Sequence, residues 1–186
     1  KDGRVDIAVR TRDVWTLNPG LSFSRKGGEN TVGVELEELN LLGTIGCIKH
    51  AAPAMRSGGG GSIIGMSSGA GHFPHRWLWA YGASKAGVEE VCRYAAEEFG
   101  SDAIRVNVLQ PGIIDDELMA PITGGGKLLD HYLANMPLGR VGTVNDVAEA
   151  VRFLAGPESS WITGACLPID GGHHLRAGAD YSLLFQ

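Results

Sequence analysis

The sequence predicts an α/β protein in which helices cover both faces of a parallel β-sheet. Short apolar runs alternate along the chain with segments whose apolar residues recur every three or four positions. This alternation is typical of parallel sheets, because two parallel strands need a helical crossover between them. The 186 residues contain no internal repeat and no obvious linker. We therefore expect a single domain over residues 1–186.

The first predicted elements are a strand, a loop, a helix and a second strand, and a run of glycines precedes that second strand. Val5–Val9 is a short apolar run and is predicted to be a strand, whereas residues 10–31 follow neither period and are predicted to be an irregular loop. Residues 33–55 show helical spacing. The four glycines at 58–61 should end that helix, and Ser62–Met66 is predicted to be a buried strand.

A loop rich in glycine and aromatic residues is predicted next, over residues 69–79. A helix should then run from Tyr81 to Phe99, and a strand from Ile104 to Leu109. Residues 115–136 are expected to form two weaker helices, which the glycines at 124–126 separate.

The last elements carry a capping signal. Thr143 and Asp146 have the spacing of a capping box, which predicts a helix from there to Leu154. Gly156 and Pro157 follow that helix and should end it. A final strand is expected over residues 165–169.

Charge and composition exclude several classes of protein. The net charge of −5 provides no basic surface for nucleic acid, and no apolar run reaches the roughly 18 residues that a membrane helix needs. The first residues do not resemble a signal peptide. The three cysteines form no C-x-x-C pair, which favours free thiols in a reducing cytoplasm. We therefore expect a cytoplasmic protein that acts on a small molecule.

Tyr81 and Lys85 form the most informative pair in the sequence. They lie four residues apart in a predicted helix, so both side chains share one helical face. An ammonium group beside a phenol favours the phenolate and lowers the pKa of the tyrosine. Such a phenol can act as a general acid and base, and Ser68 upstream could hydrogen-bond the reacting oxygen. For an isolated Y-x-x-x-K, an ordinary exposed helix would be the better interpretation.

Several further motifs follow one another in a familiar order. In these segments the chain resembles the classical short-chain dehydrogenase/reductases, from about residue 40 to residue 172. The resemblance implies a Rossmann-like doubly wound parallel sheet, of which only the C-terminal strands and helices would be present. The motifs that carry it are Asn40-Leu-Leu-Gly-Thr44, Gly61-Ser-Ile-Ile-Gly-Met-Ser-Ser68, Tyr81-Gly-Ala-Ser-Lys85, Ile104-Arg-Val-Asn-Val-Leu-Gln-Pro-Gly112, Pro137-Leu-Gly-Arg140 and Asp170-Gly-Gly172.

The resemblance also implies catalytic roles. Tyr81 would be the acid and base, and Lys85 would lower the pKa of Tyr81 and hold the nicotinamide ribose. Ser68 would orient the carbonyl or alcohol, and Asn40 would carry a water-linked proton relay to Lys85. The implied reaction is hydride transfer that interconverts a carbonyl and an alcohol.

The implied cofactor is NAD or NADP, which supplies the hydride. Tyr81 and Lys85 would contact it, together with Pro111, Gly112 and Ile114 at the end of a strand. The residues that choose between NAD and NADP would lie in a preceding half of the fold.

Three departures from the family pattern keep a second interpretation open. No glycine-rich turn that could bind a pyrophosphate stands between a strand and a helix. Residues 10–13 replace the family's Asn-Asn-Ala-Gly, and Asp116 stands where a threonine is usual. The chain could be part of an ordinary reductase, or a diverged homologue that serves as a structural or binding subunit without catalysis.

The loop at 69–79 supports weaker hypotheses. His72 and His75 have an H-x-x-H spacing, but no further ligand cluster is evident, so we expect no metal site. The apolar residues of this loop could contact a bulky apolar substrate, or they could simply pack against neighbouring elements. The same two interpretations hold for residues 118–136, where the family has its substrate lid. The loop residues in question are Phe73, Trp77, Leu78 and Trp79.

The C-terminal tail predicts an interface. Tyr181, Leu183, Leu184 and Phe185 stand close together and are too apolar to lie in water. In the family, helices matching 33–55 and 81–99 pair across a two-fold axis. We therefore expect a homodimer or homotetramer, with the tail on a neighbouring subunit or on the lid. A tail folded onto its own domain is the alternative.

Overall fold

A computed structural model describes residues 25–26, 29–30, 37–176, 178–181 and 183. The strand predicted at Val5–Val9 and most of the predicted loop at 10–31 lie outside these residues. Within that loop, β1 (Arg25–Lys26) and β2 (Glu29–Asn30) pair antiparallel, so this part is a short strand pair rather than irregular chain.

Three parallel strands form the central sheet. Its order is β3 (Gly61–Met66), β4 (Ile104–Pro111) and β7 (Cys166–Ile169). The middle strand, β4, is almost wholly buried, as expected for a strand with a neighbour on each side and helices on both faces. The predicted parallel sheet is thereby confirmed.

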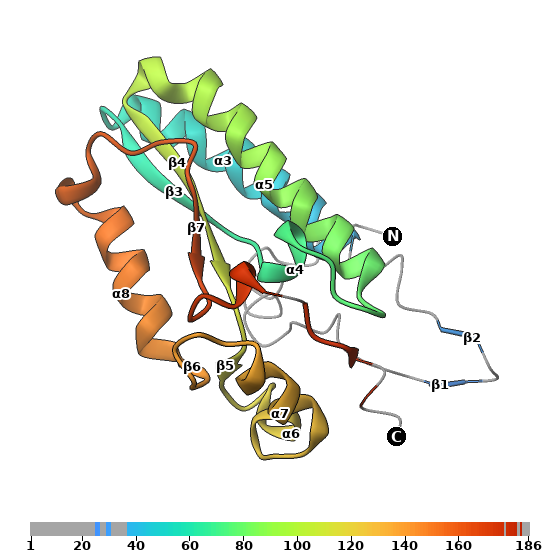
Figure 1. Cartoon of the computed structure of the whole chain (residues 1–186). Helices are drawn as coiled ribbons and strands as arrows, with labels where there is room; N and C mark the ends of the chain where they lie inside the picture. Colours follow the sequence, from blue (N-terminus) through green and yellow to red (C-terminus); the bar gives the residue numbers. More distant parts are fainter. Residues whose placement is uncertain (1–24, 27–28, 31–36, 177, 182, 184–186) are drawn as a thin grey trace.

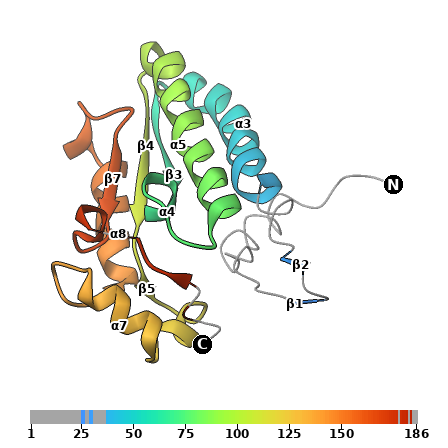
Figure 2. The ribbon, with the colours of Figure 1, turned by 45° about the vertical axis from the view of Figure 1, so that its right-hand side comes forward.

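Helices cover the sheet in two layers. Helices α3 (Gly43–Ser57) and α5 (Trp79–Phe99) lie on one face, and α8 (Val144–Ala155) lies on the other (Figures 1 and 2). Helix α5 is the crossover between β3 and β4. Its apolar stripe packs on alternate residues of β4, namely Ile104, Val106 and Val108.

The residues of β4 that lie between these, on its other face, hydrogen-bond to the end of α8 and to the segment before β7. The Arg105 guanidinium donates to the carbonyl oxygens of Leu154 and Gly156 at the end of α8. Asn107 donates to the Ile162 carbonyl and accepts from the Ala165 amide, at 2.8 and 3.1 Å. Asn107 is buried and Arg105 is half-buried, and each satisfies backbone groups that would otherwise lack partners.

The remaining elements are short. They are the π-helical segment η2 (Glu37–Leu42), α4 (Gly69–His72), η3 (Gly100–Asp102), β5 (Ile114–Asp115), α6 (Ala120–Thr123), α7 (Lys127–Ala134), β6 (Gly142–Thr143), η4 (Pro157–Ser159) and η5 (His173–Leu175). Strand β5 pairs with β6 in parallel. The described part of the chain contains no helix with the length and apolar character needed to cross a membrane.

Most predicted boundaries agree with these elements. The helix expected over residues 33–55 is described from Glu37, and its first part is π-helical. The two helices predicted between 115 and 136 are α6 and α7, with the glycine run between them. The predicted capping box of Thr143 and Asp146 opens α8. The loop predicted over residues 69–79 is wrong in one respect, because α4 occupies its start and Ser68 caps that helix.

The sheet brings three chain segments to one edge. Because β3, β4 and β7 are parallel, the residues that follow Met66, Pro111 and Ile169 all leave the sheet at its carboxyl edge. Ligands of open α/β sheets bind in the crevice outside this edge.

Candidate active site

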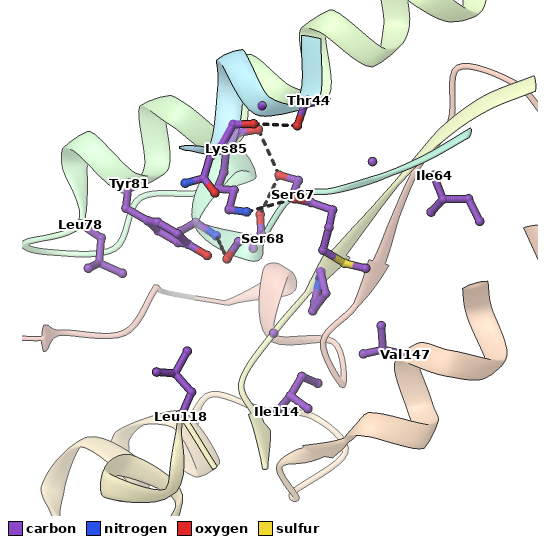
Figure 3. Close-up of a pocket in the computed structure, with 18 of the residues that line it drawn as sticks. Thr44, Ile64, Ser67, Ser68, Leu78, Tyr81, Lys85, Ile114, Leu118 and Val147 are labelled. Carbon is purple, nitrogen blue, oxygen red and sulfur yellow. Dashed lines mark hydrogen bonds between the residues drawn. The ribbon is translucent and has the colours of Figure 1, made fainter. Parts of the chain in front are cut away.

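A pocket of about 1010 Å³ opens at the carboxyl edge of the sheet. Its walls come from α3, α5, α8 and the segments that follow all three strands of the sheet. Figure 3 shows Tyr81, Lys85 and Ser68 on one side of this space, with Ile114 and Leu118 across it. Every catalytic and cofactor-binding residue predicted from the sequence lines the pocket: Asn40, Ser68, Tyr81, Lys85, Pro111, Gly112 and Ile114.

Tyr81 and Lys85 lie side by side on the first turns of α5. Both are buried, and the Lys85 Nζ is 5.7 Å from the centre of the Tyr81 ring. The Lys85 Nζ also donates to the carbonyl oxygen of Met66, at 3.0 Å, at the end of β3. Burial lowers the pKa of Lys85 to about 8. The ammonium is therefore held beside the phenol by the strand end, in a place where its positive charge is poorly solvated.

The two consecutive serines point to different partners. Ser67 is buried, and its Oγ donates to the Glu89 Oε1 at 2.7 Å. The Ser68 Oγ accepts from the Ala70 amide at 3.2 Å, and Ser68 lines the pocket on the same side as Tyr81 (Figure 3). The Ser67 hydroxyl is thus bonded to Glu89, and the choice of Ser68 as the catalytic serine stays a prediction.

Beneath the two serines lies a buried polar network that the sequence did not indicate. The Glu89 Oε1 accepts both from the Ser67 Oγ and from the Gln110 Nε2, at 2.7 and 2.8 Å. A Cβ at Gly71 in α4 would stand only 2.9 Å from the same carboxylate oxygen. Hydrogen bonds to a carboxylate are stronger than those between neutral groups. This network therefore joins the ends of β3 and β4 to α5 directly below the pocket.

Asn40 reaches α5 through a different residue from the one expected. Its Nδ2 donates to the Ser84 Oγ at 3.1 Å, and the Ser84 Oγ donates to the Tyr81 carbonyl at 2.8 Å. Asn40 is half-buried and lines the pocket. The water-linked relay from Asn40 to Lys85 stays a prediction.

The segment after β4 forms the floor of the pocket. Gly112 packs so closely on Asp170 that a Cβ at position 112 would lie 2.8 Å from the Asp170 Cβ. Asp116 is exposed at the rim, where its Oδ1 accepts from the Met119 amide at 2.8 Å. The carboxylate at this position therefore caps the turn before α6.

Aromatic and imidazole rings form the wall beside Tyr81. The hydroxyls of Tyr132 in α7 and Tyr181 in the tail are hydrogen-bonded at 2.8 Å, and both residues are buried. Burial, reinforced by the neighbouring phenols, raises the pKa of Tyr132 well above its usual range, and burial raises the pKa of Tyr181 to about 12. Burial also lowers the pKa of His75. At neutral pH these three side chains are therefore uncharged.

Some residues of the loop predicted over 69–79 line the pocket, and others are exposed to solvent. Phe73 and Leu78 line the pocket, whereas Trp77 and Trp79 are exposed. His75 lines the pocket, but His72 is exposed and lies outside it. Within the described part of the chain, no three His, Cys, Asp or Glu side chains gather into a site that could hold a metal ion.

The tail and the lid meet within one chain. Tyr181 packs with Tyr132 and Leu128 of α7 in the same apolar cluster, so this tail residue is folded onto its own domain. This contact fits both the expected docking of the tail on the lid and the alternative of a tail folded onto its own domain. Leu184 and Phe185 lie outside the described residues.

The comparisons with known proteins identify the family of the chain. A family model described as Enoyl-(Acyl carrier protein) reductase matches residues 4–174, which is most of the chain. The chain belongs to the short-chain dehydrogenase/reductase family. The Rossmann-like α/β fold predicted from the sequence is also confirmed, because the similar solved structures of this family have it.

Three similar members of the short-chain dehydrogenase/reductase family cover much of the chain. A cis-4-hydroxycyclohexanecarboxylate dehydrogenase of Sinomonas cyclohexanicum is 37% identical over 136 residues, with 73% of this chain and 54% of the relative covered. A solved short-chain type dehydrogenase/reductase from Mycobacterium ulcerans is 42% identical with a TM-score of 0.78, with 80% of this chain and 54% of that chain covered.

The third is a 7α-hydroxysteroid dehydrogenase solved with NADH and 7-oxo glycochenodeoxycholic acid, which is 31% identical with a TM-score of 0.70. The match covers 73% of this chain and 53% of that one. The chain thus spans about half the length of these three proteins.

Proposed function

We propose that this protein is an NAD(P)-dependent oxidoreductase that interconverts a carbonyl and an alcohol in a small molecule. The observation that carries the proposal is the burial of Tyr81 beside Lys85 in a pocket that Ser68 also lines. Solved relatives bound to a nicotinamide cofactor support it.

In this proposal each side chain has a defined role. The Tyr81 phenol donates a proton to the carbonyl oxygen during reduction and removes it during oxidation. Lys85 places a positive charge beside the phenol, which favours the phenolate. Ser68 donates a hydrogen bond to the reacting oxygen, and Asn40 supports the relay of protons towards Lys85.

The pocket suits the nicotinamide end of the cofactor. It extends without interruption from the segment at Asn40, past Lys85, to Pro111, Gly112 and Ile114, which leaves room for a planar ring over the end of β4. NAD or NADP, when bound, would supply or accept the hydride. The five residues that would hold this end are Tyr81, Lys85, Pro111, Gly112 and Ile114.

Isotope transfer tests the proposal directly. The complete product of the gene is incubated with a ketone and with NADH or NADPH that carries deuterium at the transferred position. We expect deuterium at the carbinol carbon of the alcohol product, as shown by mass spectrometry. An alcohol without deuterium would refute hydride transfer.

A second candidate is a family member that serves as a structural or binding subunit without catalysis. Asp116, which caps a turn where a hydroxyl is usual, favours it. Absence of turnover with every ketone tested, together with stable association with another subunit, would support this candidate.

The 186-residue chain alone should bind NAD(H) and NADP(H) very weakly, which calorimetric titration measures. A cytoplasmic location and a homodimeric or homotetrameric state stay predictions.

A further inference from the structure

The wall beside Tyr81 combines an apolar surface with neutral polar groups. Leu78, which precedes α5, lies on the Tyr81 side, and the wall faces Ile114 and Leu118 across the pocket (Figure 3). Its polar groups include the imidazoles of His75 and His173 and the bonded hydroxyls of Tyr132 and Tyr181. A ligand at this wall therefore meets an apolar enclosure with a few neutral hydrogen-bonding groups.

Charge is scarce on the described lining of this pocket. Apart from imidazoles, Lys85 and Asp116 carry its basic and acidic side chains. The Lys85 ammonium donates to the Met66 carbonyl and, in the proposed function, serves Tyr81 and the cofactor. Asp116 is at the rim, where it would repel an anion. A carboxylate held against the wall would lose its hydration without gaining a cationic partner, which is strongly unfavourable.

His75 gives the wall an acceptor. Its Nδ1 lies 3.1 Å from the Phe73 carbonyl oxygen. A carbonyl oxygen can only accept, so in the neutral ring Nδ1 carries the proton and Nε2 is the acceptor. A hydroxyl group on a ligand could donate to this nitrogen, whereas a carboxylate has no hydrogen to donate.

We propose that this wall selects uncharged secondary alcohols and ketones whose compact apolar body carries a second hydroxyl group, and that His75 and the Tyr132–Tyr181 pair are its specificity-determining residues. The inference rests on the proposed function and names the substrate class of the same site. It separates this protein from the relative in Sinomonas cyclohexanicum, whose named substrate carries a carboxylate.

Three substrates that share one ring test the proposal. They are cis-cyclohexane-1,4-diol, cyclohexanol and cis-4-hydroxycyclohexanecarboxylate, which differ only in the substituent opposite the reacting carbon. With the complete gene product and its cofactor, we expect kcat/KM to be about tenfold higher for the diol than for cyclohexanol, as one added hydrogen bond allows. We expect the carboxylate to be the poorest of the three, by about tenfold or more relative to cyclohexanol.

Two matched variants test whether His75 is responsible for the preference for the diol. His75→Leu should reduce the ratio of kcat/KM for the diol to that for cyclohexanol to about one. His72→Leu, which changes an exposed histidine outside the pocket, should leave that ratio near its original value. Since the substrate ranking of the unaltered protein is measured independently, the proposal stays testable if His75→Leu does not fold.

Binding measurements separate the two proposals. Calorimetry on the cofactor-bound protein reports affinity for the diol and the carboxylate without turnover. Selective binding of the diol without any turnover would support the wall and refute the proposed function. The proposed selectivity of the wall would be refuted if the protein preferred the carboxylate in turnover or binding. It would also be refuted if the protein bound none of the three compounds.

Discussion

Two apolar clusters of this protein differ in how they are built. The first, here termed the scaffold core, lies between the sheet and helices α3 and α5. Its buried members are Ile48, Ala52, Val88, Cys92, Ala95, Ala96, Ile104, Val106 and Val108. The second, the pocket core, joins the start of α5 to α6, α7 and the tail. Its buried members are Leu78, Tyr81, Ile113, Ile122, Leu128, Tyr132, Met136, Ala179 and Tyr181.

The scaffold core supports the fold, whereas the pocket core forms part of the candidate site. The scaffold core contains small and aliphatic side chains from regular helices and strands, which bury area without hydrogen-bonding demands. The pocket core contains three tyrosines, whose hydroxyls need partners when buried. Because Tyr81 belongs to the pocket core and its helix belongs to the scaffold core, rigid packing on one side positions reactive groups on the other.

The largest expected effect is chemical and lies in the pocket core. Tyr81→Phe removes the proton-transferring hydroxyl and should lower kcat about 10²- to 10⁴-fold, while cofactor affinity changes little. The control is Tyr94→Phe, which alters an exposed tyrosine of the same helix. Steady-state kinetics of the complete gene product measure both. Comparable turnover in the Tyr81 variant would refute the acid and base assignment.

Matched core truncations should separate the two clusters. Ile104→Ala in the scaffold core and Leu128→Ala in the pocket core should each lower the free energy of unfolding by about 2–5 kcal/mol. Only Leu128→Ala should also raise KM, because α7 carries Tyr132 at the pocket wall. Denaturant unfolding and kinetics test this.

Leu138→Ala, at an exposed leucine, is the control for both truncations and should change the free energy of unfolding by less than about 0.5 kcal/mol. An equal rise in KM for Ile104→Ala would show that the two clusters do not act separately.

A smaller effect depends on pH. The pKa of Lys85 is about 8 in the folded chain against 10.5 for a free side chain. Between these values the unfolded chain binds more protons, so the contribution of Lys85 to stability becomes more favourable as pH rises. Relative to Lys85→Met, the unaltered protein should gain on the order of 2 kcal/mol across this window.

Denaturant unfolding at several pH values measures the pH effect. Lys49→Met provides the control, because Lys49 is exposed. A flat difference between the unaltered protein and the Lys85 variant would contradict the lowered pKa.

The smallest expected effect lies at the start of α8. The Thr143 Oγ1 accepts from the Asp146 amide, and the Asp146 carboxylate accepts from the Thr143 amide. Thr143→Ala should therefore lower the free energy of unfolding by about 1 kcal/mol. Ser160→Ala, at an exposed serine, should have almost no effect. Equal melting temperatures for the two variants would show that the cap does not stabilise this helix.

The same division explains what could be predicted from the sequence. The stripe of α5 and the alternation of β4 follow local periods, so the scaffold core and the positions of Tyr81 and Lys85 were predictable. The choice of Ser68 over Ser67 rests on the spacing to Tyr81 in the family motif and stays a prediction.

The pocket wall was not predictable in the same way. A contact of the tail with the lid was one expected arrangement, but the bond between Tyr132 and Tyr181 was not, because these residues are far apart in the chain and neither lies in a motif. The partner of Asn40 is Ser84, which is itself on the helix that carries Tyr81, and helical spacing alone did not single it out. Buried polar pairs such as Glu89 with Gln110 depend on which strand ends meet, and that is a property of topology.

Gly65 in β3 has a consequence for how this chain can change over time. A Cβ at position 65 would lie 2.6 Å from the Cys92 Sγ of α5, closer than such atoms approach. A mutation to alanine at 65 would therefore be selected against unless position 92 had first become smaller. The two positions should covary among descendants of this sequence, with Cys92→Ala preceding Gly65→Ala. The order of these two substitutions along a lineage is thereby constrained by the contact between one strand and one helix.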